Sequence, residues 1–191
     1  MISAIQQRLR NADDGSVAVE AAFIIPILIL IVFGVVEFSI ILRNNAALAG
    51  ATRAGARVAS AEPRIATFST DAAKAVMESG VAMPVGEIEE IWVYRAGTNG
   101  YPYGQSSFAN CGASCARFIV RDNQPVKVAD AYPATSVNAC PGSMHNVGVY
   151  IKAKHNFVTG LFGANMTLTN DAAAKFEPIP TSREDLDYTC R

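Results

Sequence analysis

Residues 17–42 read VAVEAAFIIPILILIVFGVVEFSIIL, and this apolar stretch decides the fold of the chain. Its only charged residues are Glu20 and Glu37, and residues 21–36 between them carry no charge. As an α-helix the stretch would be about 39 Å long, which exceeds the roughly 30 Å hydrocarbon core of a bilayer. A cleaved signal peptide is the alternative, but its apolar core runs only about 7–15 residues. We therefore predict one membrane-spanning helix.

Composition and charge exclude several classes of protein. The chain has 191 residues, of which 50% are hydrophobic and 17% are charged, so it is not disordered as a whole. The formal net charge is -1, and no basic excess points to nucleic acid as a partner. Membrane lipid is the partner that the composition predicts.

The cysteines indicate on which side of the membrane the larger part lies. Arginines flank the apolar stretch in similar number on both sides, so the positive-inside rule does not choose an orientation. All four cysteines follow residue 110 and lack the spacing of a metal site, which fits disulfides in an oxidising compartment. We expect a single-pass protein of the cytoplasmic (inner) membrane whose C-terminal part is extracytoplasmic.

Pro26 lies inside the predicted helix and should kink it. Proline removes one backbone donor and clashes with the carbonyl of the preceding turn. Membrane helices tolerate such a residue where neighbouring groups satisfy the freed carbonyl.

A second helical stretch, residues 44–61, follows the apolar one and is rich in small residues. Alanines and glycines recur there at steps of four, which places them on shared helix faces where another helix could approach closely. The alternative is that this is only a good helix former, but each of its two glycines costs about 1 kcal/mol relative to alanine. Glu62 and Pro63 should end the helix. The predicted packing face consists of Ala47, Gly50, Ala51, Arg53, Gly55 and Arg57.

The remainder predicts an α+β domain with a small antiparallel sheet. We expect a short helix over Asp71–Ser79, capped by Ser69 or Thr70 and stopped by Gly80. Alternating apolar residues predict an antiparallel sheet with one wet face and the helix on the other. Residues 96–115, rich in Gly, Asn, Ser and Tyr, predict a long surface loop. The expected strands are Glu87–Ala96, Ala116–Arg121, Val147–Phe157 and Met166–Phe176.

No motif supports catalysis, and we predict a structural protein without enzyme activity, cofactor or metal. His155 lies on the apolar side of an alternating strand, so we interpret it as a core histidine. Glu89 and Glu90 fit a solvated strand edge better than a catalytic pair. No phosphate-binding loop or nucleophile elbow occurs.

The four cysteines are interpreted as disulfide partners. A bond between Cys111 and Cys115 would staple the tip of the long loop. A bond between Cys140 and Cys190 would tie the end of the chain to the β-domain and could stabilise it by roughly 4 kcal/mol in the chain-entropy model. Four cysteines allow three connectivities, and the sequence alone does not choose among them.

Gly15 to Glu20 read GSVAVE and resemble the processing site of a type IV prepilin. A polar leader ends in glycine, and a glutamate is the fifth residue after it. The resemblance implies cleavage between Gly15 and Ser16 by an aspartyl prepilin peptidase. The new amine of Ser16 would then compensate Glu20 of a neighbouring subunit during assembly, because an unpaired charge at low dielectric is penalised.

The resemblance narrows to one family over a longer stretch. DGSVAVEAAF at residues 14–23, FGVVEF at 33–38 and ATRAGAR at 51–57 resemble the TadE-like family, which are pseudopilins of the tight-adherence (Flp, type IVc) pilus. The family implies processing by the prepilin peptidase and action with other pilins, an assembly ATPase and the inner-membrane platform. The major pilins of that system are far shorter and have tyrosine where this chain has Ala21.

These inferences divide the chain into three parts and leave two functions open. Residues 1–15 would be a leader, 16–62 a transmembrane and assembly helix, and 63–191 an extracytoplasmic α+β domain with a pilin-like architecture. The main hypothesis is a minor pilin. The alternative is an uncleaved anchor with an extracytoplasmic binding domain that uses the loop around Tyr101, Pro102 and Tyr103.

Overall fold

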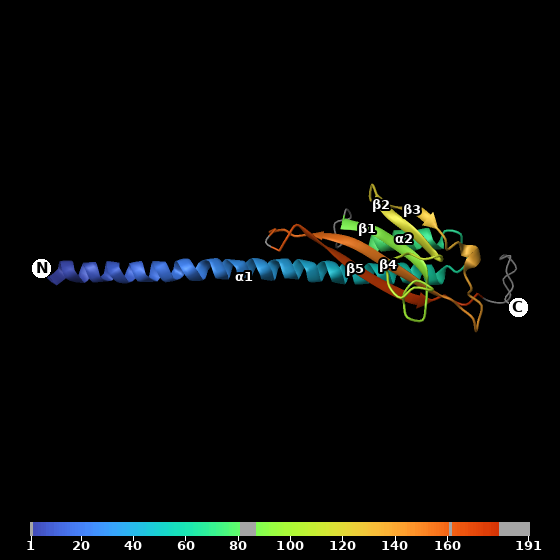
Figure 1. Ribbon diagram of the computed structural model, residues 1–191, viewed down its shortest axis with the longest axis horizontal. Helices are drawn as coiled ribbons and strands as arrows, with labels where there is room; N and C mark the ends of the chain where they lie inside the picture. The colour runs from blue at the N-terminus through green and yellow to red at the C-terminus, as the bar shows by residue number, and fades with distance from the viewer. Residues whose placement is uncertain (1, 81–86, 161, 180–191) are drawn as a thin grey trace. The chain divides into compact units, whose positions relative to one another are not determined.

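The computed structural model of the protein describes residues 2–80, 87–160 and 162–179 (Figure 1). The predicted fold class is confirmed: a long apolar N-terminal helix is followed by a small antiparallel sheet. The helices are α1 (Ile2–Ala61) and α2 (Phe68–Ser79), with a short 3-10 turn, η2 (Ala134–Ser136). The strands are β1 (Ile88–Ala96), β2 (Cys115–Arg121), β3 (Gln124–Asp130), β4 (Asn146–Asn156) and β5 (Asn165–Lys175).

The chain forms two compact units, and the boundary between them lies inside α1. The first unit is Met1–Ile41 and the second is Leu42–Arg191. The helix ends at Ala61, just before the predicted stop at Pro63. Residues 42–61 therefore belong to the second, globular unit.

The sheet has five strands in the order β3-β2-β1-β4-β5, and all the pairs are antiparallel. Strand β3 was not predicted. It pairs with β2 through a two-residue turn, Asp122–Asn123, in which both residues have positive φ (49° and 61°). Positive φ at both central residues defines the type I′ turn of tight hairpins, and Asn and Asp tolerate it best after glycine. The pair Asp-Asn was thus the overlooked signal.

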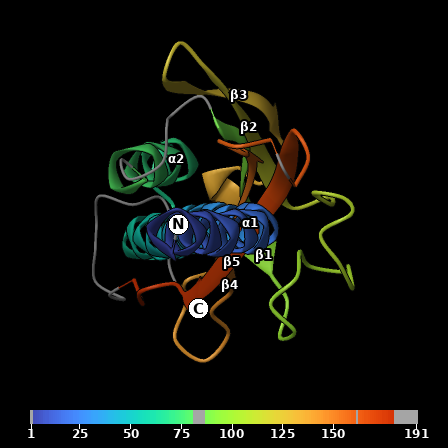
Figure 2. The ribbon, with the colours of Figure 1, turned by 90° about the vertical axis from the view of Figure 1, so that its left-hand side faces the viewer.

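The helices cover one face of the sheet. Figure 2 shows the teal end of α1 and the green helix α2 on the same side of the strands. Helix α2 starts at Phe68 and buries its apolar side, including Phe68 and Val76. The predicted caps Ser69 and Thr70 lie inside the helix, and the N-cap position is Thr67, without a side-chain hydrogen bond. Gly80 ends the helix as predicted, and its N–H donates to the carbonyl of Val76.

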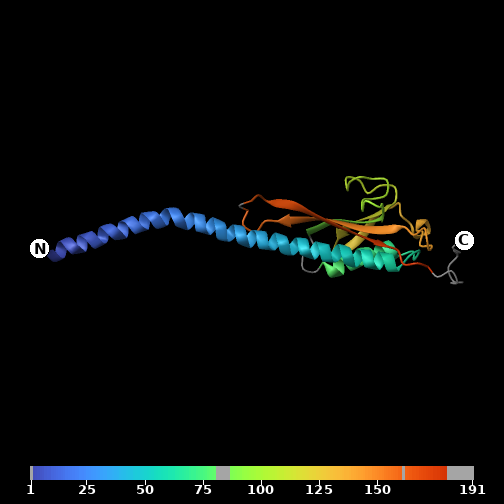
Figure 3. The ribbon, with the colours of Figure 1, turned by 90° about the horizontal axis from the view of Figure 1, so that it is seen from below.

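The opposite face of the sheet is not wet at its centre, contrary to the prediction. The yellow-green loop after β1 lies over this face (Figure 3). Beneath it, Trp92, Tyr94 and Tyr150 are buried, and Phe108 from the loop stacks on Tyr150 with ring centroids 4.5 Å apart. The long loop therefore covers the aromatic side chains on the sheet face opposite the helices. The alternation of apolar residues along a strand does not predict such a cover.

Candidate functional site

The predicted processing and assembly residues lie on α1. Gly15, Ser16 and Glu20 are all helical and solvent-exposed, and among the described residues no other segment lies within 4 Å of the place where a Gly15 side chain would start. Ser16 and Glu20 are four residues apart, which places them on the same helix face. The side chains of Ser16 and Glu20 are therefore accessible on the surface of the helix.

The apolar stretch of α1 exposes nearly all of its large side chains. Phe23 is 73% exposed and Leu30 is 54% exposed. The helix is long and apolar enough to cross a membrane. Soluble monomers rarely expose such a continuous apolar surface, which is consistent with membrane association. The backbone remains helical through Pro26, and the predicted kink there stays a prediction.

The small-residue stretch of α1 has two different sides. Ala51 and Gly55 are buried against the rest of the globular unit, as are Leu48 and Ala59. The other members of the predicted packing face are at least partly accessible: Ala47 is half-buried, and Gly50, Arg53 and Arg57 are exposed. One side of this stretch therefore packs within its own domain, and the other is available to a partner.

Gly55 is a point of close approach between the layers. A Cβ built on Gly55 would lie 2.6 Å from Cγ2 of Val76 in α2 and 3.1 Å from the carbonyl oxygen of Ala72. It would also lie 3.4 Å from Cγ1 of Val149 in β4. The absent side chain therefore lets α1 contact α2 and the sheet at the same place.

Two polar contacts fix α1 along the C-terminal strands, and neither was predicted. The side-chain amide Nδ2 of Asn44 lies 3.0 Å from Nδ1 of His155, and both residues are buried. The hydroxyl of Thr52 donates to Oδ1 of Asn170 at 3.0 Å. His155 is the core histidine that the strand pattern indicated, but its partner is 111 positions away in sequence. The alternation of apolar residues along a strand predicts which sheet face a side chain is on. It does not predict which helix residue that side chain contacts.

A surface groove runs along the accessible side of the same stretch. Arg57 and Glu177 both line this groove, so it contains one positively and one negatively charged residue. The groove is lined by Ala54, Arg57, Val58, Ser60, Ala61 and Glu177.

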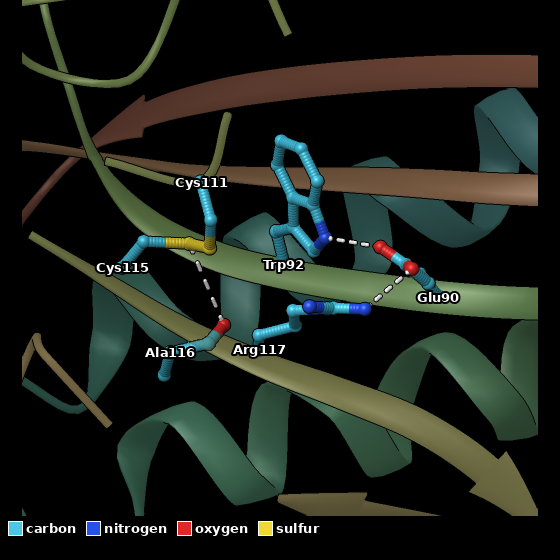
Figure 4. Close-up of a disulfide and its surroundings, with 6 residues drawn as sticks. All are labelled: Glu90, Trp92, Cys111, Cys115, Ala116 and Arg117. Carbon is cyan, nitrogen blue, oxygen red and sulfur yellow. Dashed lines mark hydrogen bonds and ion pairs between the residues drawn. A yellow bond between two sulfur atoms is a disulfide. The ribbon is translucent and has the colours of Figure 1, made fainter. Parts of the chain in front are cut away.

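The long loop is closed by the predicted Cys111–Cys115 disulfide, whose Cα atoms are 5.6 Å apart (Figure 4). Cys140 is also disulfide-bonded, whereas Cys190 lies outside the described residues. The loop folds back on the sheet, with Pro102 buried and bridged to Ala96.

The binding surface suggested around Tyr101 is small. The ring of Tyr101 packs on Phe108, with centroids 5.0 Å apart. Arg95 places its guanidinium 3.8 Å from the ring centre of Tyr103. Tyr103 is 53% exposed and is the main side chain of this motif that a partner could reach.

The charged and titratable groups near the loop have structural partners. Glu90 accepts from the indole N–H of Trp92 at 2.9 Å and from Nη2 of Arg117 at 2.8 Å (Figure 4). It is therefore an ion-paired strand residue, not simply a solvated one. Burial, and secondarily the charge of Asp171, raises the pKa of Tyr94, so its hydroxyl stays neutral and donates to the carbonyl of Gly100. The described residues contain no cluster of potential metal ligands.

Comparison with known proteins gives a family match within helix α1 and none in the sheet-containing part of the chain. The family model described as TadE-like protein matches residues 15–57. This is the family that the sequence resembles, and the match starts at the predicted processing glycine. It covers less than a quarter of the chain, and no curated protein and no solved structure matches.

Proposed function

We propose that this chain, which matches the TadE-like family over residues 15–57, is a minor pilin (pseudopilin) needed to assemble tight-adherence (Flp, type IVc) pili. The family match supports a pilin-like protein associated with the Tad pilus. The proposal adds processing, a role in assembly and the absence of catalysis. Its partners would be membrane lipid, the prepilin peptidase, other pilins and the inner-membrane assembly platform.

The observation that carries the proposal is the position of Gly15 and Glu20 on α1. The glycine ends a polar leader, and the glutamate lies inside an exposed apolar helix. A carboxylate in the middle of a membrane helix costs about 2.5–3.5 kcal/mol on insertion scales, and less near its end. Such a residue is retained most readily when a cation compensates it.

Cleavage after Gly15 would supply that cation. In the intact chain the nitrogen of Ser16 is a neutral amide inside α1. After cleavage it becomes an amine, which is mostly protonated at neutral pH because α-amino groups have pKa values near 8. A charged amine on one subunit and Glu20 on the next would then attract strongly within an apolar filament core.

Determining the N-terminus of the mature protein tests the processing step. We expect the protein from cells with the prepilin peptidase to begin at Ser16, and that from cells lacking the peptidase to begin upstream of Gly15. A Gly15→Ala variant should remain uncleaved in both strains. An identical, uncleaved terminus in both strains would sink the proposal.

Replacing the carboxylate tests the assembly step separately. We expect Glu20→Ala to enter the membrane normally but to abolish pili, because the amine of the neighbouring subunit loses its partner. Glu20→Asp keeps the charge and serves as the matched control, with partial assembly expected. Pilus number by electron microscopy and membrane content by immunoblotting give the two readouts. Normal piliation of Glu20→Ala would refute the pairing role.

The uncleaved anchor remains the rival function. It requires only that residues 16–42 hold the domain at a membrane, so an unrelated membrane helix of equal length should replace them without loss. The minor-pilin proposal expects this replacement to abolish pili. The limited exposure around Tyr101 and Pro102 gives the rival a small binding surface.

A further inference from the structure

The tip of the β4–β5 hairpin carries apolar side chains on its surface. We define the apolar tip as Phe157, Val158 and Phe162. Val158 is 72% exposed, Phe162 is 60% exposed, and the rings of Phe157 and Phe162 lie 6.4 Å apart. Hairpin turns of soluble domains are normally polar, because they project into water.

The direction of the strands places this tip at one particular end of the globular unit. Along α1 from Asn44 to Gly55, the neighbouring positions of β4 run backwards from His155 to Val149. His155, which contacts Asn44, is only two residues before Phe157, the first residue of the apolar tip. Asn44 is two residues after Leu42, where the apolar stretch of α1 ends. The tip is thus at the end of the domain where the chain arrives from that stretch.

The charges around the tip fit a lipid surface. Lys154 on β4 and Arg43 on α1 are exposed, and residues 154–164 contain no acidic side chain. Exposed apolar side chains flanked by basic ones are typical of segments that lie in the headgroup region of anionic membranes. These features occur at the end of the domain that contains Leu42, its first residue.

We propose that the apolar tip inserts into the interface of the same bilayer that residues 17–42 are proposed to span. The domain would then contact the membrane at two places, through α1 and through the hairpin. Two contacts restrict its rotation about α1. This inference needs the membrane span but not the cleavage at Gly15, so it can fail independently of the minor-pilin proposal.

A fluorescent label at the tip tests the insertion. The described cysteines are disulfide-bonded, so an introduced cysteine provides a labelling site. We would label Val158→Cys with an environment-sensitive fluorophore, in the full chain reconstituted into vesicles of phosphatidylcholine and phosphatidylglycerol. The matched control is Thr135→Cys, which is exposed and lies in η2, near the other end of the domain where Arg64 follows α1.

Lipids with a quencher on the acyl chain distinguish the outcomes. We expect emission from position 158 to shift to shorter wavelength and to be quenched severalfold more than emission from position 135. The inference would be overturned if the label at position 158 had the same emission wavelength and the same weak quenching as the label at position 135. A shifted but unquenched label would also overturn it, because it would indicate burial against a second copy of the chain. Flotation of the vesicles establishes membrane integration beforehand, so failure of the span is recognised separately.

A second variant removes the dependence on a label at the tip itself. Asn156→Cys places the fluorophore on an exposed position beside the tip. We expect Phe162→Asp in this background to reduce its lipid quenching, because a carboxylate at the tip opposes insertion. Unchanged quenching would contradict a role of Phe162. Since Phe162 is largely exposed, the substitution should leave the fold intact, which circular dichroism would check.

Discussion

The two halves of α1 are built from the same backbone and contrast in what they expose. Between residues 17 and 42 the helix exposes most of its large apolar side chains, such as Phe23 and Leu30. Between residues 44 and 61 the side chains are mostly small, and one side is buried completely, including Ala51 and Gly55. The large apolar side chains of the first half are compatible with the hydrocarbon of a bilayer. The small side chains of the second half allow the sheet to pack closely against the helix.

The two halves of this helix therefore differ in both the size and the polarity of their side chains. Large apolar residues all round a helix indicate lipid or apolar partners, whereas a narrow stripe of small residues indicates close packing on one side. In this chain the change occurs near Leu42, which is also where the globular unit begins. The other side of the second half is accessible and carries Arg53 and Arg57.

The largest effect should come from the same charge placed in each half. Ile29→Asp puts a carboxylate near the middle of the apolar stretch, where insertion scales assign a cost of about 2.5–3.5 kcal/mol. Asn45→Asp is the matched control at an exposed position of the second half. We expect alkaline extraction to release much of the first variant from membranes and none of the second. Equal retention would show that the two halves do not differ in their environment.

A smaller effect should follow from loss of the buried polar contact. Asn44→Ala leaves Nδ1 of His155 buried without its partner, beside an Nε2 atom that already lacks one among the described residues. Leaving a buried polar group unsatisfied costs about 1–3 kcal/mol. We expect the free energy of unfolding, measured by urea titration in detergent, to fall by that amount. Trp92, the only tryptophan and a buried one, reports unfolding of this unit.

Two controls separate the hydrogen bond from other consequences of the substitution. Asn45→Ala, at the exposed neighbouring position, should be neutral or slightly stabilising, because alanine is the better helix former. Replacing both partners, Asn44→Leu with His155→Phe, should recover most of the lost stability, since no polar group is then left unsatisfied. A loss as large in Asn45→Ala as in Asn44→Ala would contradict the role assigned to the contact.

The sequence predicted features that depend on local pattern. The apolar stretch indicated a long helix, alternation gave four of the five strands, and Gly80 marked the end of α2. The family resemblance rested on residues 14–57 and agrees with the match over residues 15–57. Each of these signals is contained within a few turns or one strand, so no long-range contact is needed to recognise it.

The features that were missed depend on contacts between distant segments. The burial of Tyr150 arises from Phe108 in a loop that joins other strands. The partner of His155 is a helix residue that resembles its exposed neighbour Asn45 in type. Which glycine of α1 faces the sheet also could not be read from spacing, because Gly50 and Gly55 each belong to a row of small residues.

These two glycines allow the smallest but most discriminating test of the comparison. Alanine is favoured over glycine in a helix by about 1 kcal/mol, so Gly50→Ala, with open space around its Cβ position, should stabilise the globular unit by up to that amount. At Gly55 the same substitution meets Val76, a stiff β-branched side chain that is fully buried. Overpacking of this kind costs about 1–3 kcal/mol, which exceeds the gain in helix propensity.

We therefore expect Gly55→Ala to lower the free energy of unfolding by about 1 kcal/mol while Gly50→Ala raises it, with Trp92 fluorescence during urea titration as the measure. The opposite signs matter more than the magnitudes, because both variants make the same chemical change in the same helix. If both stabilise equally, α1 does not approach α2 and β4 as closely as Gly55 suggests. The buried side of the second half would then tolerate added side-chain volume as well as the exposed side does.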